Sequence, residues 1–242
     1  MKKLFIILGV FFLLLIAAAF ILPIIFKDDI RKLIDQAIAE NVNAEVYYAP
    51  EEFQLSLFKN FPHATVSLGD FGVVNRPPFA GDTLLSVDEF NISVDLKSII
   101  FSNQPRITGI ILNQPNIHIQ VLEDGTANYD IAIASEDTTI VKEESSSGEV
   151  SFTIDHWEIN EANVIYEDLT LPMYLAIANM THEGSGDFTL DVFDLETHTV
   201  IDRFTVNYDG VEYMSDKHLT ADATLNMNLP EGKYTFKENS VA

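Results

Sequence analysis

Hydrophobic residues form one unbroken block near the N-terminus. The run from Leu4 to Phe26 holds 23 residues without a charge, and about 20 apolar residues are enough for a helix to cross a bilayer. Lys2 and Lys3 precede the run, and lysines on that side favour an N-terminus in the cytoplasm. We therefore predict a cytoplasmic lead and a transmembrane helix over residues 1–26, with the rest of the chain exported.

A cleaved signal peptide is the alternative interpretation of the same run. Ala17-Ala18-Ala19 offers a small-residue cleavage pattern. Cleavage there would leave the apolar segment 20–26 as the new N-terminus, and the whole run is longer than the hydrophobic part of a normal signal peptide. The length of the run therefore favours a retained membrane anchor.

Residues 27–43 show a helical spacing of apolar positions. Apolar side chains recur at intervals of three and four, which predicts a short amphipathic helix. The apolar stripe either covers one end of a β core or lies at the membrane interface, and core-facing stripes are the commoner case. The stripe consists of Ile30, Leu33, Ile34, Ala37, Ile38 and Val42.

From Ala44 onward, apolar and polar residues alternate one by one. The segments Phe90–Leu96 and Ile117–Val121 are clear examples. A period of two is typical of antiparallel strands that bury one face and expose the other. We therefore predict a mostly β domain over residues 44–242, built as a long antiparallel sheet. Further strands are predicted at Ala64–Leu68, Tyr129–Ile133, Val150–Ile154, Phe188–Val192, Val200–Tyr208 and Leu219–Leu229.

One segment fits no regular element. Residues 134–149 contain acidic clusters and a run of three serines. Such a composition is typical of mobile segments, so we predict a mobile acidic loop here. It either links two domains or connects two pieces of one sheet.

An internal repeat favours the second arrangement. The segment Ile107–Ile119 aligns with Ile154–Tyr166 at a constant offset of 47 residues. The first isoleucine and two asparagines are identical in both copies. The repeat predicts that one strand–turn–strand unit is used on either side of the acidic loop.

The charge balance narrows the range of functions. The chain has 14 Lys and Arg against 37 Asp and Glu, so its net charge is −23. Nucleic-acid binding needs clustered cations that neutralise phosphates, so the balance argues against a nucleic-acid partner. The chain contains no cysteine, which excludes disulfides, thiolate metal sites and a cysteine nucleophile.

The sequence carries no motif for catalysis or metal binding. Its six histidines do not pair at metal-ligand spacing, and it has neither a hydrolase elbow nor a phosphate-binding loop. The acidic clusters lack the alternating carboxylates and central glycine of a calcium loop. We therefore expect a protein that is not an enzyme and that holds no metal or cofactor.

The order of these features resembles that of the AsmA family. A short lead, one membrane helix, an amphipathic helix and a series of strands follow one another, and the resemblance covers residues 1–180. The remainder is similar to members from Bacteroidetes. The segments that carry the resemblance are Asn60–Pro62, Thr65–Leu68, Leu84–Leu96, Ile110–Ile117 and Asp124–Asp130.

The resemblance implies a protein of the Gram-negative cell envelope. Its expected location is the inner membrane, crossed once, with the C-terminal bulk in the periplasm. Relatives build a long, twisted, taco-like sheet that forms an open apolar groove, and they are implicated in phospholipid transport between the inner and outer membranes and in outer-membrane biogenesis. The expected partners are the membrane, phospholipid and other envelope proteins. Family members are usually much longer, so the transport expectation concerns the full protein.

The alternation also predicts which side chains line such a groove. Residues of one parity share a face, and a shift of one residue in register would move them all to the other face. The alternative function is a structural or assembly factor of the envelope, in which two sheets bury their apolar faces in a closed β core. The predicted lipid-facing residues are Val66, Leu68, Phe90, Ile92, Val94, Ile117, Ile119, Val121, Val164 and Tyr166.

Overall fold

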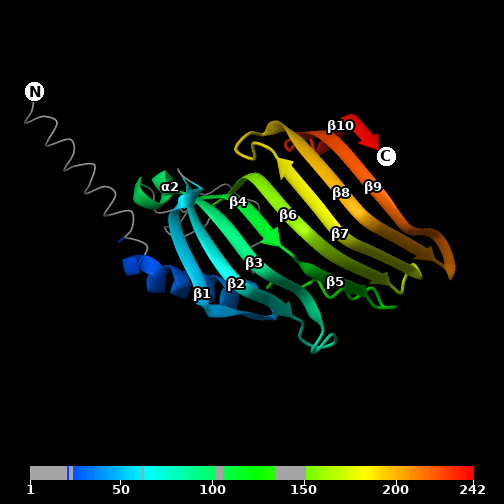
Figure 1. The fold of residues 1–242 in the computed structure, drawn as a ribbon, viewed down its shortest axis with the longest axis horizontal. Coiled ribbons are helices and arrows are strands. Elements are labelled where there is room, and N and C mark those ends of the chain that lie inside the picture. Colours follow the sequence, from blue (N-terminus) through cyan, green and yellow to red (C-terminus); the bar gives the residue numbers. More distant parts are fainter. Residues whose placement is uncertain (1–20, 22–23, 61–62, 102–105, 134–150) are drawn as a thin grey trace, which may run out of the picture.

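The computed structural model describes residues 21, 24–60, 63–101, 106–133 and 151–242. These residues form one large sheet with helical segments near its N-terminal end (Figure 1). Residues 24–41 are helical, and the short helix α2 (Leu96–Phe101) follows the third strand. The predicted mostly β architecture is therefore confirmed, while the predicted loop 134–149 lies outside the described residues.

The described residues contain ten strands in a single sheet. Their order across the sheet is β1-β2-β3-β4-β6-β7-β8-β9-β10, and β5 pairs with β3 and β6. The strands are β1 (Glu45–Asn60), β2 (His63–Val74), β3 (Thr83–Asp95), β4 (Arg106–Asn113), β5 (Asn116–Val121), β6 (Ser151–Asp168), β7 (Met173–Ser185), β8 (Val192–Tyr208), β9 (Val211–Asn228) and β10 (Lys233–Val241).

The sheet is mixed, so the prediction of an antiparallel sheet throughout is wrong. Both β4 and β5 run parallel to β6, whereas the other neighbouring strands are antiparallel. A parallel pair needs a long connection to bring the chain back, and residues 122–150 separate β5 from β6. Side chains alternate in the same way for either direction, so the sequence pattern does not reveal the parallel pairing.

The two copies of the 47-residue repeat lie side by side in this parallel pairing. Residues that face each other differ by 47 in number along most of β4 and all of β5. The identical asparagines meet: Asn160 Nδ2 donates to Asn113 Oδ1 at 3.1 Å, and Asn163 Nδ2 donates to Asn116 Oδ1 at 3.1 Å. The repeat is therefore confirmed, but the predicted strand–turn–strand unit is wrong for the second copy, because residues 154–166 lie within the single continuous strand β6.

Two of the predicted strands do not form within the described part of the chain. Residues 129–133 make only an isolated bridge, to Val42. Residues 188–191 form the turn before β8, where the backbone N–H and the hydroxyl of Thr189 both donate to the Asp187 carboxylate. A side-chain bond of this kind closes a turn, and it overrides the short apolar alternation in that segment.

A line of backbone irregularities crosses the sheet from β2 to β9. Residues other than glycine adopt positive φ on this line, with values between 48° and 55°. Register shifts occur along several of the same strand pairs. A bulge adds one residue to a strand, so the alternation of side chains changes phase there. The bulge line consists of Asp70, Gln114, Glu161, Asn179 and Asp216.

In β2, the phase change keeps one face apolar along the strand. In β2, Val66 and Leu68 precede the bulge while Phe71 and Val73 follow it, and all four are buried in one cluster. In a regular strand, residues three apart such as Leu68 and Phe71 would point to opposite faces. The irregularity at Asp70 therefore interrupts β2 without moving its apolar side chains to the polar face.

The main core lies beneath β1–β3, where the N-terminal helix packs. Ile30, Ile34 and Val42 contact the buried cluster of these strands, so the predicted core-facing stripe is confirmed at these positions. It is wrong for Leu33, which is 64% exposed, and for Ala37, which is also exposed. The residues that contact the sheet are spaced at multiples of four along the helix. Leu33 and Ala37 lie beside this row, on the side that faces solvent.

The predicted membrane span lies mostly outside the described residues. Of the run from Leu4 to Phe26, only residues 21 and 24–26 are described. Among the described residues, no helix has the length and apolar character needed to cross a bilayer.

Candidate functional site

The first predicted lipid-facing residues meet across β2 and β3. Val66 lies opposite Ile92, and Leu68 lies opposite Phe90. Residues directly opposite each other share a face of the sheet. Val94 continues the alternation of Ile92 in β3, so these five residues form one group.

A second group of predicted residues meets across β5 and β6. Ile117 lies opposite Val164, and Ile119 lies opposite Tyr166. Val121 continues the alternation of β5. The parallel pairing of the repeat thus brings together residues that are 47 positions apart.

Leu85 of β3 connects the two groups. It lies opposite Val73 of the buried cluster and also opposite Ile117. The structure therefore places all ten predicted residues on the apolar face of one sheet. That they contact lipid stays a prediction.

The apolar face is covered at one end of the sheet and exposed at the other. Leu68 of β2 is 1% exposed, whereas Tyr234 and Phe236 of β10 are 59% and 66% exposed. Figure 1 shows the N-terminal helix beside β1 and β2, far from β10. In the part of the chain that the structure describes, neither helix packs on β6–β10. This half of the apolar face is therefore left uncovered by the described residues.

The sequence-based set of residues missed the part of the face carried by β8–β10. Val206 lies opposite Leu175 and Met214 lies opposite Val206, while Phe236 lies opposite Leu225. These pairs extend the apolar face beyond the predicted residues. The alternation of apolar and polar residues in β8 and β9 is the sequence signal that could have identified these apolar positions.

An aromatic cluster lies at one end of β6, β7 and β8. Trp157 lies over Gly184, where a Cβ would come within 2.0 Å of the indole. Phe188 packs against Trp157 and Phe193, with ring centroids 6.3 and 4.7 Å apart. Burial lowers the pKa of His182, whose ring lies 6.2 Å from that of Trp157. Burial therefore favours the neutral form of this imidazole on the apolar face.

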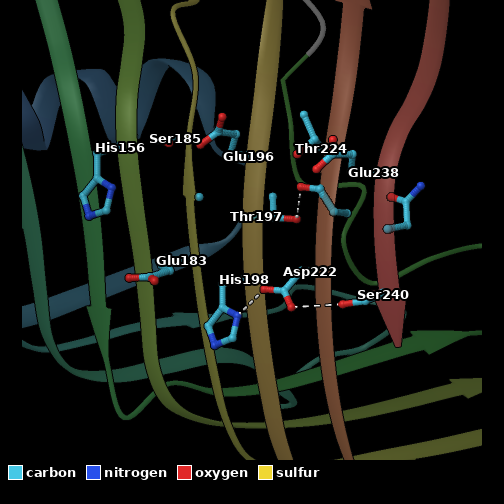
Figure 2. A pocket seen from close by; sticks show the side chains of 13 residues that line it. His156, Glu183, Ser185, Glu196, Thr197, His198, Asp222, Thr224, Glu238 and Ser240 are labelled. Carbon is cyan, nitrogen blue, oxygen red and sulfur yellow. Dashed lines mark hydrogen bonds and ion pairs between the residues drawn. The ribbon is translucent and has the colours of Figure 1, made fainter. Parts of the chain in front are cut away.

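A depression of about 690 Å³ is lined mainly by polar side chains of β6–β10 (Figure 2). His198 Nδ1 lies 2.6 Å from Asp222 Oδ1, and Ser240 Oγ donates to Asp222 Oδ2 at 3.1 Å. Both contacts lower the pKa of Asp222, the contact with His198 most. Because the carboxylate lies between the imidazole and the hydroxyl, His198 is not placed to take a proton from Ser240 as nucleophilic catalysis requires.

Other histidines of the sheet pair with single carboxylates. His118 Nε2 lies 3.1 Å from Glu167 Oε2, and His156 Nε2 lies 2.7 Å from Glu158 Oε1. Within the described ranges, no three histidine or carboxylate side chains converge so that they could hold a metal ion. Contacts within a solvated, polar sheet face account for these pairs.

The chain can now be compared with known proteins. A model of the AsmA family matches residues 1–185. The chain belongs to the AsmA family. The AsmA match ends at the last residue of β7, so the N-terminal helix and β1–β7 lie within it, and β8–β10 extend the same sheet. No curated protein and no solved structure matches the chain.

Proposed function

We propose that this AsmA family protein binds phospholipid acyl chains on its apolar sheet face and contributes to phospholipid transport between the inner and outer membranes. The observation that carries the proposal is the uncovered half of that face, over β6–β10. Each methylene group that an apolar surface removes from water contributes about 0.8 kcal/mol. Acyl chains therefore bind such a surface without directional contacts, and the function needs no catalytic side chain, metal or cofactor.

The proposal includes a location in the inner membrane, with one span over Leu4 to Phe26 and the sheet in the periplasm. The length and apolarity of that run support the span. Lys2 and Lys3 support the orientation. Membership of the AsmA family supports a role in the envelope, where other envelope proteins are the further expected partners.

A structural or assembly factor of the envelope is the second candidate. The packed cluster beneath β1–β3, which includes Phe53 and Leu68, favours it because that part of the apolar face is already filled. The described cluster does not extend to β10, where Tyr234 and Phe236 are exposed. Lipid binding therefore accounts for more of the apolar face than a closed core does.

Lipid extraction from the full chain tests the proposal. The chain is purified in a non-ionic detergent, and its bound phospholipid is quantified by mass spectrometry. Val206→Asp places a carboxylate on the apolar face of β8, and Asn207→Asp places the same charge on the opposite face, one residue further along. We expect Val206→Asp to lose bound phospholipid and Asn207→Asp to retain it. Equal lipid content in both variants and the parent contradicts the proposal.

A further inference from the structure

A second cavity, of about 430 Å³, lies between the N-terminal helix and β1. Its apolar wall includes Ile38, Val42, Val46 and Ile133. Val42 and Val46 also pack against the buried cluster beneath β1–β3. The cavity therefore adjoins the covered end of the apolar sheet face.

The polar wall of this cavity carries charges of both signs. Arg76, from the connection between β2 and β3, lines it together with Asp35 and Glu45. Arg76 Nη1 donates to Asn43 Oδ1 at 3.1 Å, and within the described residues Arg76 lies in no ion pair. The Tyr48 hydroxyl donates to Asp35 Oδ1 at 2.5 Å. A guanidinium carries five N–H donors, so Arg76 retains donors for a ligand.

These side chains match an amphiphile with a zwitterionic headgroup. A guanidinium binds phosphate oxygens through paired N–H groups. The carboxylate of Glu45 attracts an ammonium group and repels a headgroup with net negative charge, whereas Asp35 adds less because Arg31 Nε already lies 3.9 Å from its Oδ2. The apolar wall accepts methylene groups. A headgroup that carries both a phosphate and an ammonium, attached to an acyl chain, satisfies all three parts.

The position of the cavity along the N-terminal helix suits a ligand that comes from a bilayer. Asp35 follows Phe26, the last residue of the predicted span, by nine positions. At a rise of 1.5 Å per residue, this separation is about 14 Å along the helix. The cavity therefore lies within reach of the bilayer surface from which the proposed lipid ligand is drawn.

We propose that this cavity binds a phospholipid whose headgroup carries both a phosphate and an ammonium. The phosphate lies on Arg76, the ammonium lies beside Asp35 and Glu45, and the first methylene groups lie against Ile38 and Val46. This site rests on the proposed lipid-binding function, because it is the place where a lipid first contacts the apolar face.

Binding of single-chain lipids to the full chain tests this site. The chain is held in maltoside micelles, and adducts are counted by native mass spectrometry with lysophosphatidylethanolamine, lysophosphatidylglycerol and free phosphoethanolamine as probes. We expect lysophosphatidylethanolamine to bind best, and Arg76→Gln to weaken its binding about tenfold, the usual effect of losing one hydrogen bond to a charged group. Arg203→Gln, at an exposed position of β8, is the matched control and retains binding.

A cavity-filling pair of variants provides an independent readout. Ala39 lines the cavity, whereas Ala37 lies two positions earlier on the exposed side of the same helix. We expect Ala39→Trp to block lysophosphatidylethanolamine and Ala37→Trp to leave its binding unchanged. Because both alanines are exposed, neither substitution disturbs the buried cluster.

Three outcomes overturn the site. The first is unchanged binding in both Arg76→Gln and Ala39→Trp, and the second is equally tight binding of lysophosphatidylglycerol. The third is equally tight binding of free phosphoethanolamine, which would assign the cavity to a soluble phosphate ester. If Val206→Asp removes co-purified lipid while Ala39→Trp binds normally, this site fails and the proposed function stands. If Val206→Asp removes no lipid, the proposed function itself fails.

Discussion

Asp70 adopts a left-handed backbone conformation, with φ 48°, in the middle of β2. This conformation costs an ordinary L-residue about 1–2 kcal/mol, and aspartate and asparagine tolerate it best. Four further polar residues share it along the bulge line. The backbone conformation therefore accounts for the aspartates and the asparagine at positions 70, 179 and 216.

Replacement of Asp70 tests this explanation. Asp70→Val is expected to lower the free energy of unfolding by about 1–2 kcal/mol, because a β-branched side chain is strained at positive φ. Asp70→Asn is expected to change it by less than about 0.5 kcal/mol. Urea unfolding of the full chain in detergent measures both. Asp88→Val, at an exposed position of β3 without positive φ, is the control, and an equal loss there would refute the explanation.

Lys59 connects three side chains on the polar face of β2 and β3. Its Nζ lies 2.8 Å from Glu89 Oε1, 2.9 Å from Asn91 Oδ1 and 3.3 Å from Ser67 Oγ. The bond from Lys59 is the main cause of the lowered pKa of Glu89. A carboxylate with a lowered pKa in the folded state stabilises that state above its unfolded pKa, near 4.5, and loses this contribution as the pH falls through the folded pKa.

Lys59→Met is therefore expected to destabilise the protein more at pH 7 than at acid pH. Both side chains of the pair are substantially exposed, so the loss at pH 7 is about 0.5–1 kcal/mol. At acid pH, below the lowered pKa of Glu89, the carboxylate is protonated and most of this loss should vanish. Urea unfolding at both pH values measures the difference, with the exposed Lys97→Met as control. A loss that is the same at both pH values contradicts the assignment.

In the N-terminal helix, fewer apolar residues contact the core than the helical spacing of the sequence predicted. Ile34 packs against the buried cluster, whereas the adjacent Leu33 is exposed. Ile34→Ala is expected to cost about 1–2 kcal/mol, less than a fully buried isoleucine because Ile34 is only partly buried. Leu33→Ala should change stability by less than about 0.5 kcal/mol. Thermal unfolding of the two variants checks the contrast, and equal losses would mean that the helix does not dock in this orientation.

The strands illustrate which features of an element its sequence predicts. Alternation identifies the faces of β3 and β5 because side-chain direction depends only on the period of two. It does not identify the parallel partner of β4 and β5, since strand direction leaves no trace in that period. The 47-residue repeat did contain the register, because the residues that align in sequence are the ones that face each other. The bulges were not predicted, although in β2 the phase change between Leu68 and Phe71 corresponds to one of them.

At the scale of the whole molecule, burial falls from β2 to β10. Val66 and Leu68 are buried, while every residue of β10 is exposed. Amide hydrogens of β2 should therefore exchange at least about tenfold more slowly than those of β9 and β10, since local opening costs less where few apolar contacts hold a strand. Hydrogen exchange measured by mass spectrometry on the full chain checks this, and uniform protection would contradict it.

Added phospholipid provides the corresponding test of the uncovered face. If acyl chains bind there, protection should increase in β8–β10 and remain unchanged in β2, where the apolar face is already covered. The control is a maltoside without phospholipid. Increased protection confined to the polar depression of Figure 2 would instead place the ligand on the opposite face.

The candidate site was predictable only in part, and the reason lies in tertiary contacts. Alternation alone selects the apolar face, including Phe90 and Ile119. The cavity beside β1 depends on Arg76 and Ile133 meeting the helix end that holds Ile38. These residues are far apart in sequence and share no periodic pattern, so the meeting follows from the packed fold alone.

The in-register pairing of β4 and β5 with β6 also bears on how such a sheet changes its length in evolution. Several residues of one copy face, 47 positions later, a residue of the same kind, including Asn113 with Asn160 and Ile117 with Val164. A tandem duplication of this unit would supply a new strand with ready-made asparagine partners and the same order of apolar side chains. The sheet can therefore gain whole strands while its apolar face remains continuous, so its reach can evolve separately from its chemistry.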